Sequence, residues 1–125
     1  MNLPSALDAA ARKHASKPAI LWGEEQVTYE KLLGQTQSLA ASLQGEHQVY
    51  PGQRIGLWLK NCPEFVPALF GVMSAGGVVV PINNFLKAQE VSHIIRDAAV
   101  EVVITDNSMA EQAAALKQLH PELKF

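Results

Sequence analysis

Apolar residues follow two different patterns along this chain. In some segments they recur every three or four residues, which is the spacing of an amphipathic helix. Such segments run from Ser5 to Ser16, from Thr28 to Leu43, from Pro63 to about Ala75, from Glu90 to Ala98 and from Met109 to Leu119. In others, at residues 54–59, 78–80 and 102–104, the run is continuously or almost continuously apolar. Runs of this kind are typical of strands covered on both faces, as in a parallel sheet.

The N-terminal part adds a small hairpin to this alternation. Residues 19–22 and 26–29 are two short apolar or β-branched runs, and Gly23-Glu24-Glu25 forms a turn between them. Thr28 is placed to cap the helix that follows, and Ser5 with Asp8 has the spacing of a capping box. The order of elements predicts an α/β fold with a mainly parallel sheet and a small N-terminal hairpin.

Residues 1–125 have the length of a single domain. Each of the later helices is followed by a strand, and Leu123-Lys124-Phe125 is expected to begin another. A domain that stops at the first residues of an expected core strand is typical of a truncated domain.

Composition and charge argue against several classes of function. The chain is 48% hydrophobic and 18% charged, which is an ordinary globular profile. Its net charge of -2 and the lack of a basic stripe argue against nucleic-acid binding. Residues 65–86 carry no charge and are long enough to cross a bilayer, but Pro67, Gly76, Gly77 and Pro81 interrupt them, so no membrane span is expected. Cys62 is the only cysteine, which favours a reducing, cytoplasmic location.

Candidate chemistry is sparse. The glycines of residues 71–77 precede a strand and lack a following Lys-Ser/Thr, so they predict a helix stop and not a phosphate loop. The four histidines are scattered and suggest no metal site. Cys62 lies near a helix N-terminus, which can make a thiol reactive, yet no histidine is close in sequence, and a structural or incidental cysteine is favoured. Glu24 and Glu25 are adjacent in a turn and cannot act together on one substrate.

Two asparagine positions leave alternatives open. Asn61 is most simply a helix cap. Asn83 and Asn84 follow the valine strand, at the end of the sheet where open α/β folds bind ligands. They either face a pocket or belong to an ordinary loop, and the loop is favoured.

Several short stretches occur in a characteristic order and spacing. They are Pro18-Ala19-Ile20 with residues 27–32, Pro51-Gly52-Gln53-Arg54-Ile55, residues 61–65, Ala75-Gly76-Gly77 and Val80-Pro81-Ile82-Asn83. Together they resemble the adenylate-forming (AMP-binding) enzymes, in particular the acyl-CoA synthetases and fatty-acid–CoA ligases. Gln53 stands where the family usually has an acid. The resemblance implies that residues 1–125 are the outer part of the large N-terminal domain of a longer ligase, truncated before its phosphate loop.

The resemblance also implies a reaction. The parent would join a carboxylic acid, such as a fatty acid, to AMP from ATP with Mg2+, and then pass the acyl group to coenzyme A. The family's catalytic motifs lie downstream of the matched region, so no catalytic, cofactor-binding or metal-binding residue is assigned within residues 1–125. The partner implied is the rest of the same polypeptide, and a dimer through an exposed sheet edge is possible. The alternative is a stand-alone, non-catalytic α/β module for protein interaction or self-association.

Overall fold

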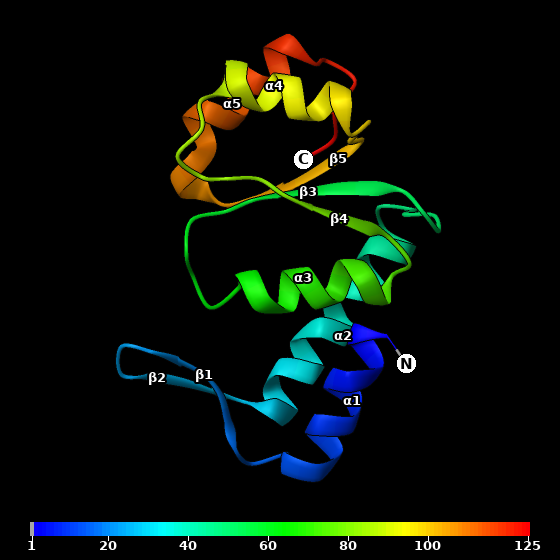
Figure 1. Cartoon of the computed structure of the whole chain (residues 1–125), viewed down its shortest axis with the longest axis vertical. Coiled ribbons are helices and arrows are strands. Elements are labelled where there is room, and N and C mark those ends of the chain that lie inside the picture. The colour runs from blue at the N-terminus through cyan, green and yellow to red at the C-terminus, as the bar shows by residue number, and fades with distance from the viewer. Residues whose placement is uncertain (1) are drawn as a thin grey trace.

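A computed structural model describes residues 2–125 of the chain, and Figure 1 shows their arrangement. The elements follow the order α1 (Leu3–His14), β1 (Pro18–Trp22), β2 (Glu25–Thr28), α2 (Tyr29–Gly45), β3 (Arg54–Trp58), α3 (Phe65–Ser74), β4 (Val78–Pro81), α4 (Ala88–Asp97), β5 (Val102–Thr105), the 3-10 turn η1 (Asn107–Met109) and α5 (Ala110–Leu119). The predicted alternation of helices and strands after an N-terminal hairpin is confirmed.

The first helix begins earlier than the sequence predicts. The side chain of Asn2 accepts a hydrogen bond from the Ser5 amide at 2.9 Å, and the Ser5 side chain returns to the Asn2 backbone. The capping box is therefore Asn2 with Ser5, and the predicted pair of Ser5 with Asp8 is wrong. Pro4 is favourable at the start of a helix, which moves the start toward the N-terminus. Asp8 instead pairs with Arg12 one turn later, at 2.9 Å.

The hairpin and the second helix form where they are predicted, but Glu25 begins β2 instead of ending the turn, and Tyr29 begins α2. Strands β1 and β2 pair antiparallel, with Trp22 opposite Glu25. Thr28 Oγ1 then accepts from the Lys31 amide at 3.2 Å and caps α2. A small core of Leu7, Val27 and Leu32 joins α1, the hairpin and α2.

Three parallel strands form the main sheet, in the order β4-β3-β5. Ile55 on the central strand pairs with Val79 on one side and with Val102 on the other. Because side chains alternate along a strand, Ile55 and Leu57 face one side of the sheet and Trp58 faces the other.

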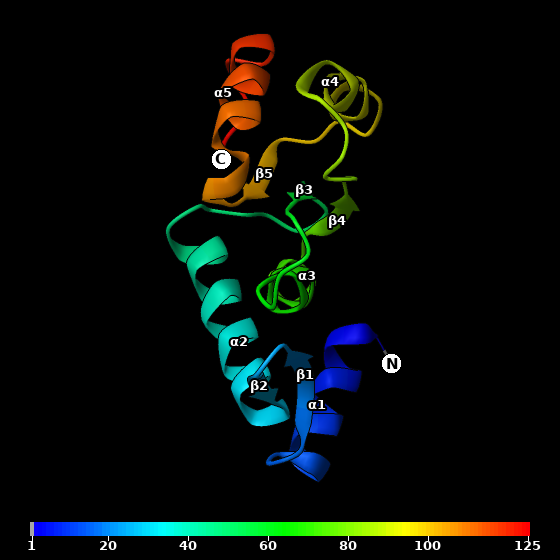
Figure 2. The same ribbon diagram turned by 90° about the vertical axis from the view of Figure 1, so that its left-hand side faces the viewer.

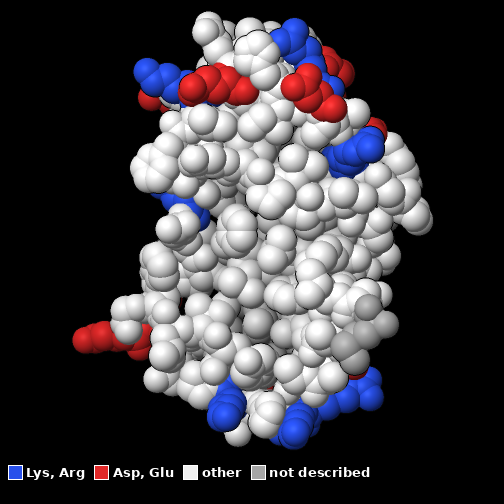
Figure 3. All heavy atoms as spheres, in the orientation of Figure 1, with Lys and Arg blue, Asp and Glu red and all other residues white. Residues whose placement is uncertain are grey.

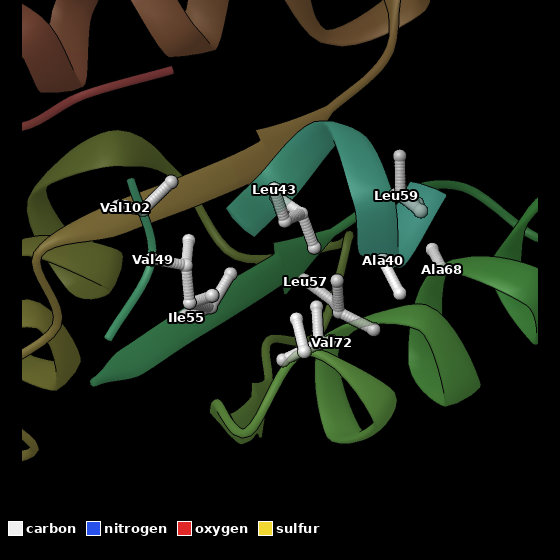
Figure 4. Packing of buried hydrophobic residues seen from close by; sticks show 10 residues of the cluster. Ala40, Leu43, Val49, Ile55, Leu57, Leu59, Ala68, Val72 and Val102 are labelled. Atoms are coloured by element: carbon white, nitrogen blue, oxygen red, sulfur yellow. The ribbon is translucent and has the colours of Figure 1, made fainter. Parts of the chain in front are cut away.

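Helices cover both faces of this sheet, as Figures 1 and 2 show. Helices α2 and α3 pack on one face, and Figure 4 shows their side chains around Ile55 and Leu57. Helices α4 and α5 pack on the other face around Trp58. At Gly71 helix α3 lies close against Leu39 of α2, so this glycine gives the two helices room to approach. The predicted parallel α/β arrangement is confirmed.

One local prediction is wrong. Asn61 does not cap the third helix, because residues 61–64 form a turn and the helix begins at Phe65, with the Phe65 amide donating to the Cys62 carbonyl at 3.1 Å.

The valine strand is the edge strand β4. Val79 packs against the core on the α2–α3 side and Val80 against the core on the α4–α5 side, so the predicted cover on both faces is confirmed. Val78, at the start of the strand, keeps 47% of its surface exposed.

The last residues begin a strand, as the sequence predicts. Lys124 forms a parallel bridge with Val102, and Leu123 is buried against the α4–α5 side of the sheet. Within residues 2–125, no helix is both long enough and apolar enough to cross a membrane.

Candidate functional site

A hollow opens where strands β3 and β5 end. Its volume is about 660 Å3. In open α/β sheets this edge, at the carboxyl ends of the strands, is where ligands bind. The floor is apolar, with Leu39, Leu59, Ala68 and Ile104, and the rim is formed by residues 60–62, Glu64 and residues 105–108.

Asp106 organises the polar rim. Its carboxylate accepts from the Ser108 amide at 2.7 Å and from the Ser108 hydroxyl, and it also accepts from the Lys60 amide at 3.4 Å. The hydrogen bond from the Ser108 hydroxyl lowers the pKa of Asp106. The carboxylate therefore joins the exits of β3 and β5 and caps the turn that leads into α5.

Cys62 lies on this rim, but its thiol is not activated. Partial burial raises its pKa, and the neighbouring Glu64 side chain raises it further. A reactive thiol requires the opposite shift, toward the thiolate. The structure therefore favours the interpretation of Cys62 as a structural or incidental cysteine.

Asn83 and Asn84 lie in a loop and do not line this hollow. Asn83 Oδ1 accepts from the Phe85 amide at 2.9 Å, and the Asn83 carbonyl accepts from the Leu86 amide at 3.1 Å. These bonds are those of a tight turn after β4, so the loop interpretation is the one that the structure supports.

The glycine-rich stretch after α3 ends the helix and returns the chain to the sheet. Gly76 has a φ of 88°, a conformation that glycine adopts at helix ends without strain. Its carbonyl accepts from the Gly52 amide at 2.9 Å. The prediction of a helix stop is confirmed.

One arrangement of side chains is missed by sequence reasoning. Ser92 Oγ of α4 lies 2.7 Å from His120 Nε2, and His120 Nδ1 lies 3.5 Å from a Glu122 carboxylate oxygen. His120 is buried, and it lines a second hollow of about 550 Å3 at the opposite end of the sheet from the first. The three residues span at most 30 positions of the sequence, and their spacing matches no known motif. Only the packing of α4 against α5 brings them together.

This trio has the order of groups found in serine hydrolases, but its surroundings do not suit that chemistry. Ser92 lies inside α4, where the backbone N–H groups are used by the helix. An acyl-transfer site needs free N–H donors for the oxyanion. The arrangement instead gives the buried imidazole of His120 a hydrogen-bond partner and links α4 to the segment after α5.

Metal-ligating side chains do not gather in the described part of the chain. No cluster of three or more His, Cys, Asp or Glu side chains able to hold a metal ion lies within residues 2–125. On the face seen in Figure 3, most charged side chains lie toward the two ends, a few lie along the left margin, and the centre of the face is uncharged.

The sequence matches a known family along nearly all of its length. The AMP-binding enzyme family matches residues 7–124. A long-chain-fatty-acid–CoA ligase of Bacillus subtilis is 34% identical over 118 residues, which are 94% of this chain and 21% of that protein. The syringomycin synthase SyrB1 of Pseudomonas syringae is 29% identical over 109 residues, which are 87% of this chain and 18% of that protein.

Solved structures share the fold. The anthranilate CoA ligase AuaEII, in complex with anthranoyl-AMP, superposes with a TM-score of 0.90 at 24% identity, over 99% of this chain and 24% of the ligase. The N-terminal subdomain of NpsA from Klebsiella oxytoca gives a TM-score of 0.81 at 23% identity, over 86% of this chain and 28% of that chain. This chain spans about a fifth of each of the two curated relatives described above. It belongs to the AMP-binding enzyme family, to which its sequence corresponds from residue 7 to residue 124.

Proposed function

We propose that this chain is the N-terminal segment of an ATP-dependent acyl-CoA ligase and is not catalytic by itself. In the proposed reaction a carboxylate attacks the α-phosphate of ATP and gives an acyl-adenylate and pyrophosphate. The thiol of coenzyme A then takes the acyl group and AMP leaves. ATP and Mg2+ would be held by the remainder of the ligase, and a fatty acid or another carboxylic acid would be the substrate.

The proposal rests on the contrast between two shares: the match covers nearly all of this chain but only a small part of the related ligase. The family match extends over residues 7–124, yet it corresponds to only about a fifth of a ligase. The fold supports the same proposal, because the described residues form a sheet packed between two layers of helices, and no cluster of metal-ligating side chains lies among them. The long-chain-fatty-acid–CoA ligases among the relatives support the fatty-acid subclass. A cytoplasmic location is part of the same proposal.

The test is carboxylate-dependent exchange between ATP and pyrophosphate. One sample is the isolated chain, and the other is a chimera in which residues 7–124 replace the matching stretch of the Bacillus subtilis ligase. We expect exchange from the chimera with long-chain fatty acids and none from the isolated chain. The unaltered ligase is the positive control.

Two results would overturn the proposal. Exchange by the pure isolated chain would place the catalytic groups within residues 1–125. A chimera that melts cooperatively but exchanges with no carboxylic acid, beside an active parent, would contradict its role in a ligase. The exchange assay on the isolated chain tests the proposal even if the chimera does not fold.

A second candidate is a stand-alone interaction module. The observation in its favour is the open edge strand β4, with Val78 partly exposed, because an unpaired edge can pair with another chain. It requires a specific oligomer of the isolated chain. Light scattering that shows a monomer at high concentration would count against it.

A further inference from the structure

We propose that the basic end of this chain, defined by Arg12, Lys13, Lys17 and Lys31, binds the surface of a bilayer that contains anionic lipids. The contact is electrostatic and peripheral. This inference rests on the proposed function, because long-chain carboxylic acids partition into bilayers, where a ligase for them would meet its substrate.

Backbone hydrogen bonds bring these cations to one end of the molecule. The Tyr29 amide donates to the Lys17 carbonyl at 3.0 Å, and the Glu30 amide donates to the Ala15 carbonyl at 3.0 Å. These bonds hold the end of α1 beside the start of α2, at the lower end of Figures 1 and 2. Lys and Arg side chains therefore gather there, and Figure 3 shows mostly their colour at this end.

The positive charge of the basic end is only partly compensated. Residues 9–23 hold three Lys or Arg and no Asp or Glu, in a chain whose net charge is -2. Arg12 pairs with Asp8 at 2.9 Å. The other three cations are exposed and make no ion pair among residues 2–125: Lys13, Lys17 and Lys31.

The helix dipoles explain part of this charge but not all of it. Arg12 and Lys13 lie in the last turn of α1, where a cation stabilises the helix end. Lys31 lies in the first turn of α2, where the dipole opposes a cation, and Lys17 belongs to neither helix. These two lysines have neither an ion pair nor a helix end that favours them. An anionic surface outside the chain would supply the missing partner.

A bilayer fits the basic end better than an acidic protein does. The centre of a protein–protein interface is usually apolar, and residues 12–17 contain no large apolar side chain. The hollows of about 550 Å3 and 660 Å3 are lined by residues elsewhere in the chain. A surface of anionic lipids attracts each nearby Lys or Arg by charge and requires neither an apolar centre nor a groove.

The experiment measures sedimentation of the isolated chain with lipid vesicles at low ionic strength. One set of vesicles is phosphatidylcholine alone, and the other contains about 40% phosphatidylserine. We expect about 30-fold stronger binding to the anionic vesicles, since the four cations attract them and Asp8 and Glu30 offset part of this attraction. The preference should disappear at about 0.5 M NaCl, where the charges are screened.

Two double variants of equal net charge test where the charge must lie. Lys17→Glu with Lys31→Glu reverses two cations of the basic end, whereas Lys87→Glu with Lys124→Glu reverses two exposed lysines elsewhere. We expect the first double variant to lose the preference for anionic vesicles and the second to keep it within about threefold. A thermal melt of each variant checks that it is folded.

Three results would overturn the proposal. The first is a parent chain that binds anionic vesicles no better than neutral ones. The second is an equal loss of binding in the two double variants. The third is binding to polyglutamate without binding to anionic vesicles, which would assign the basic end to an acidic protein.

The outcomes also separate this inference from the proposed function. A chain that prefers anionic vesicles, beside a chimera without ATP–pyrophosphate exchange, supports the bilayer contact and contradicts the ligase activity. An active chimera, beside a chain without that preference, supports the activity and contradicts the bilayer contact.

Discussion

The side-chain amide of Gln53 donates to a carboxylate oxygen of Glu101 at 3.3 Å, across the start of strands β3 and β5. Gln53 is buried, and its side-chain oxygen accepts from the Tyr50 amide at 3.4 Å. Glu101 also accepts from the Tyr50 hydroxyl, and this bond raises the pKa of Tyr50. The family usually has an acid at the position of Gln53. Beside Glu101 a second carboxylate would be repelled, whereas the Gln53 amide donates a hydrogen bond to it.

Replacing the amide by a carboxylate tests this pairing. We expect Gln53→Glu to lower the free energy of unfolding by about 1–3 kcal/mol at neutral pH, because it removes a donor and brings two negative groups together. Glu101→Gln in the same chain should restore most of the loss, and urea unfolding measures both. A variant as stable as the parent at pH 7 would show that the pair is not coupled.

The contact between α2 and α3 depends on a missing side chain at Gly71. A Cβ at this position would lie 2.8 Å from Leu39 Cδ2 and 3.1 Å from Leu39 Cβ. We expect Gly71→Ala to lower stability by about 1–3 kcal/mol, since the helices must move apart. Gly34→Ala is the matched control, because Gly34 lies in α2 with nothing within 4 Å of the added atom. It should raise stability by about 0.5–1 kcal/mol through helix propensity. Thermal melts that rank the two variants in the reverse order would refute this packing argument.

The thiol of Cys62 should react slowly. Burial and the Glu64 side chain both raise its pKa, so a smaller fraction is thiolate at a given pH than for a free cysteine. We expect alkylation by iodoacetamide at pH 8 to be slower than for free cysteine and to become faster in Glu64→Gln, which removes the nearby negative charge. Glu24→Gln, in the hairpin turn, is the control and should leave the rate unchanged. A rate above that of free cysteine would mean that the thiol is activated after all.

The Ser92–His120 hydrogen bond should contribute to stability and not to hydrolysis. Ser92→Ala leaves one nitrogen of a buried imidazole without its 2.7 Å partner, and about 1–2 kcal/mol of unfolding free energy should be lost. Release of nitrophenol from a nitrophenyl ester should be the same for the parent and the variant. Ester hydrolysis by the parent that disappears in Ser92→Ala would instead identify a catalytic serine.

The periodic part of the fold is accessible from the sequence, and the contacts between elements are not. The strands and their parallel order follow from apolar runs such as residues 102–104, and Thr28 is recognisable as a cap because its bond is local. The start of α3 is mispredicted because Asn61 has the residue type of a cap, while the turn formed by residues 61–64 depends on the chain around it. The exposure of Val78 depends on strand order, which periodicity does not contain. His120 and Ser92 come into contact only through the packing of α4 against the segment after α5, so their spacing in the sequence does not predict the hydrogen bond.

The size of the native polypeptide decides whether residues 1–125 function as part of a longer ligase. An antibody raised against this chain would be used to blot an extract of the source cells, with the purified 13.6 kDa chain as the size marker. Since the match covers about a fifth of its relatives, we predict a single band at about five times that mass. A native band at 13.6 kDa, with no larger species, would contradict the claim.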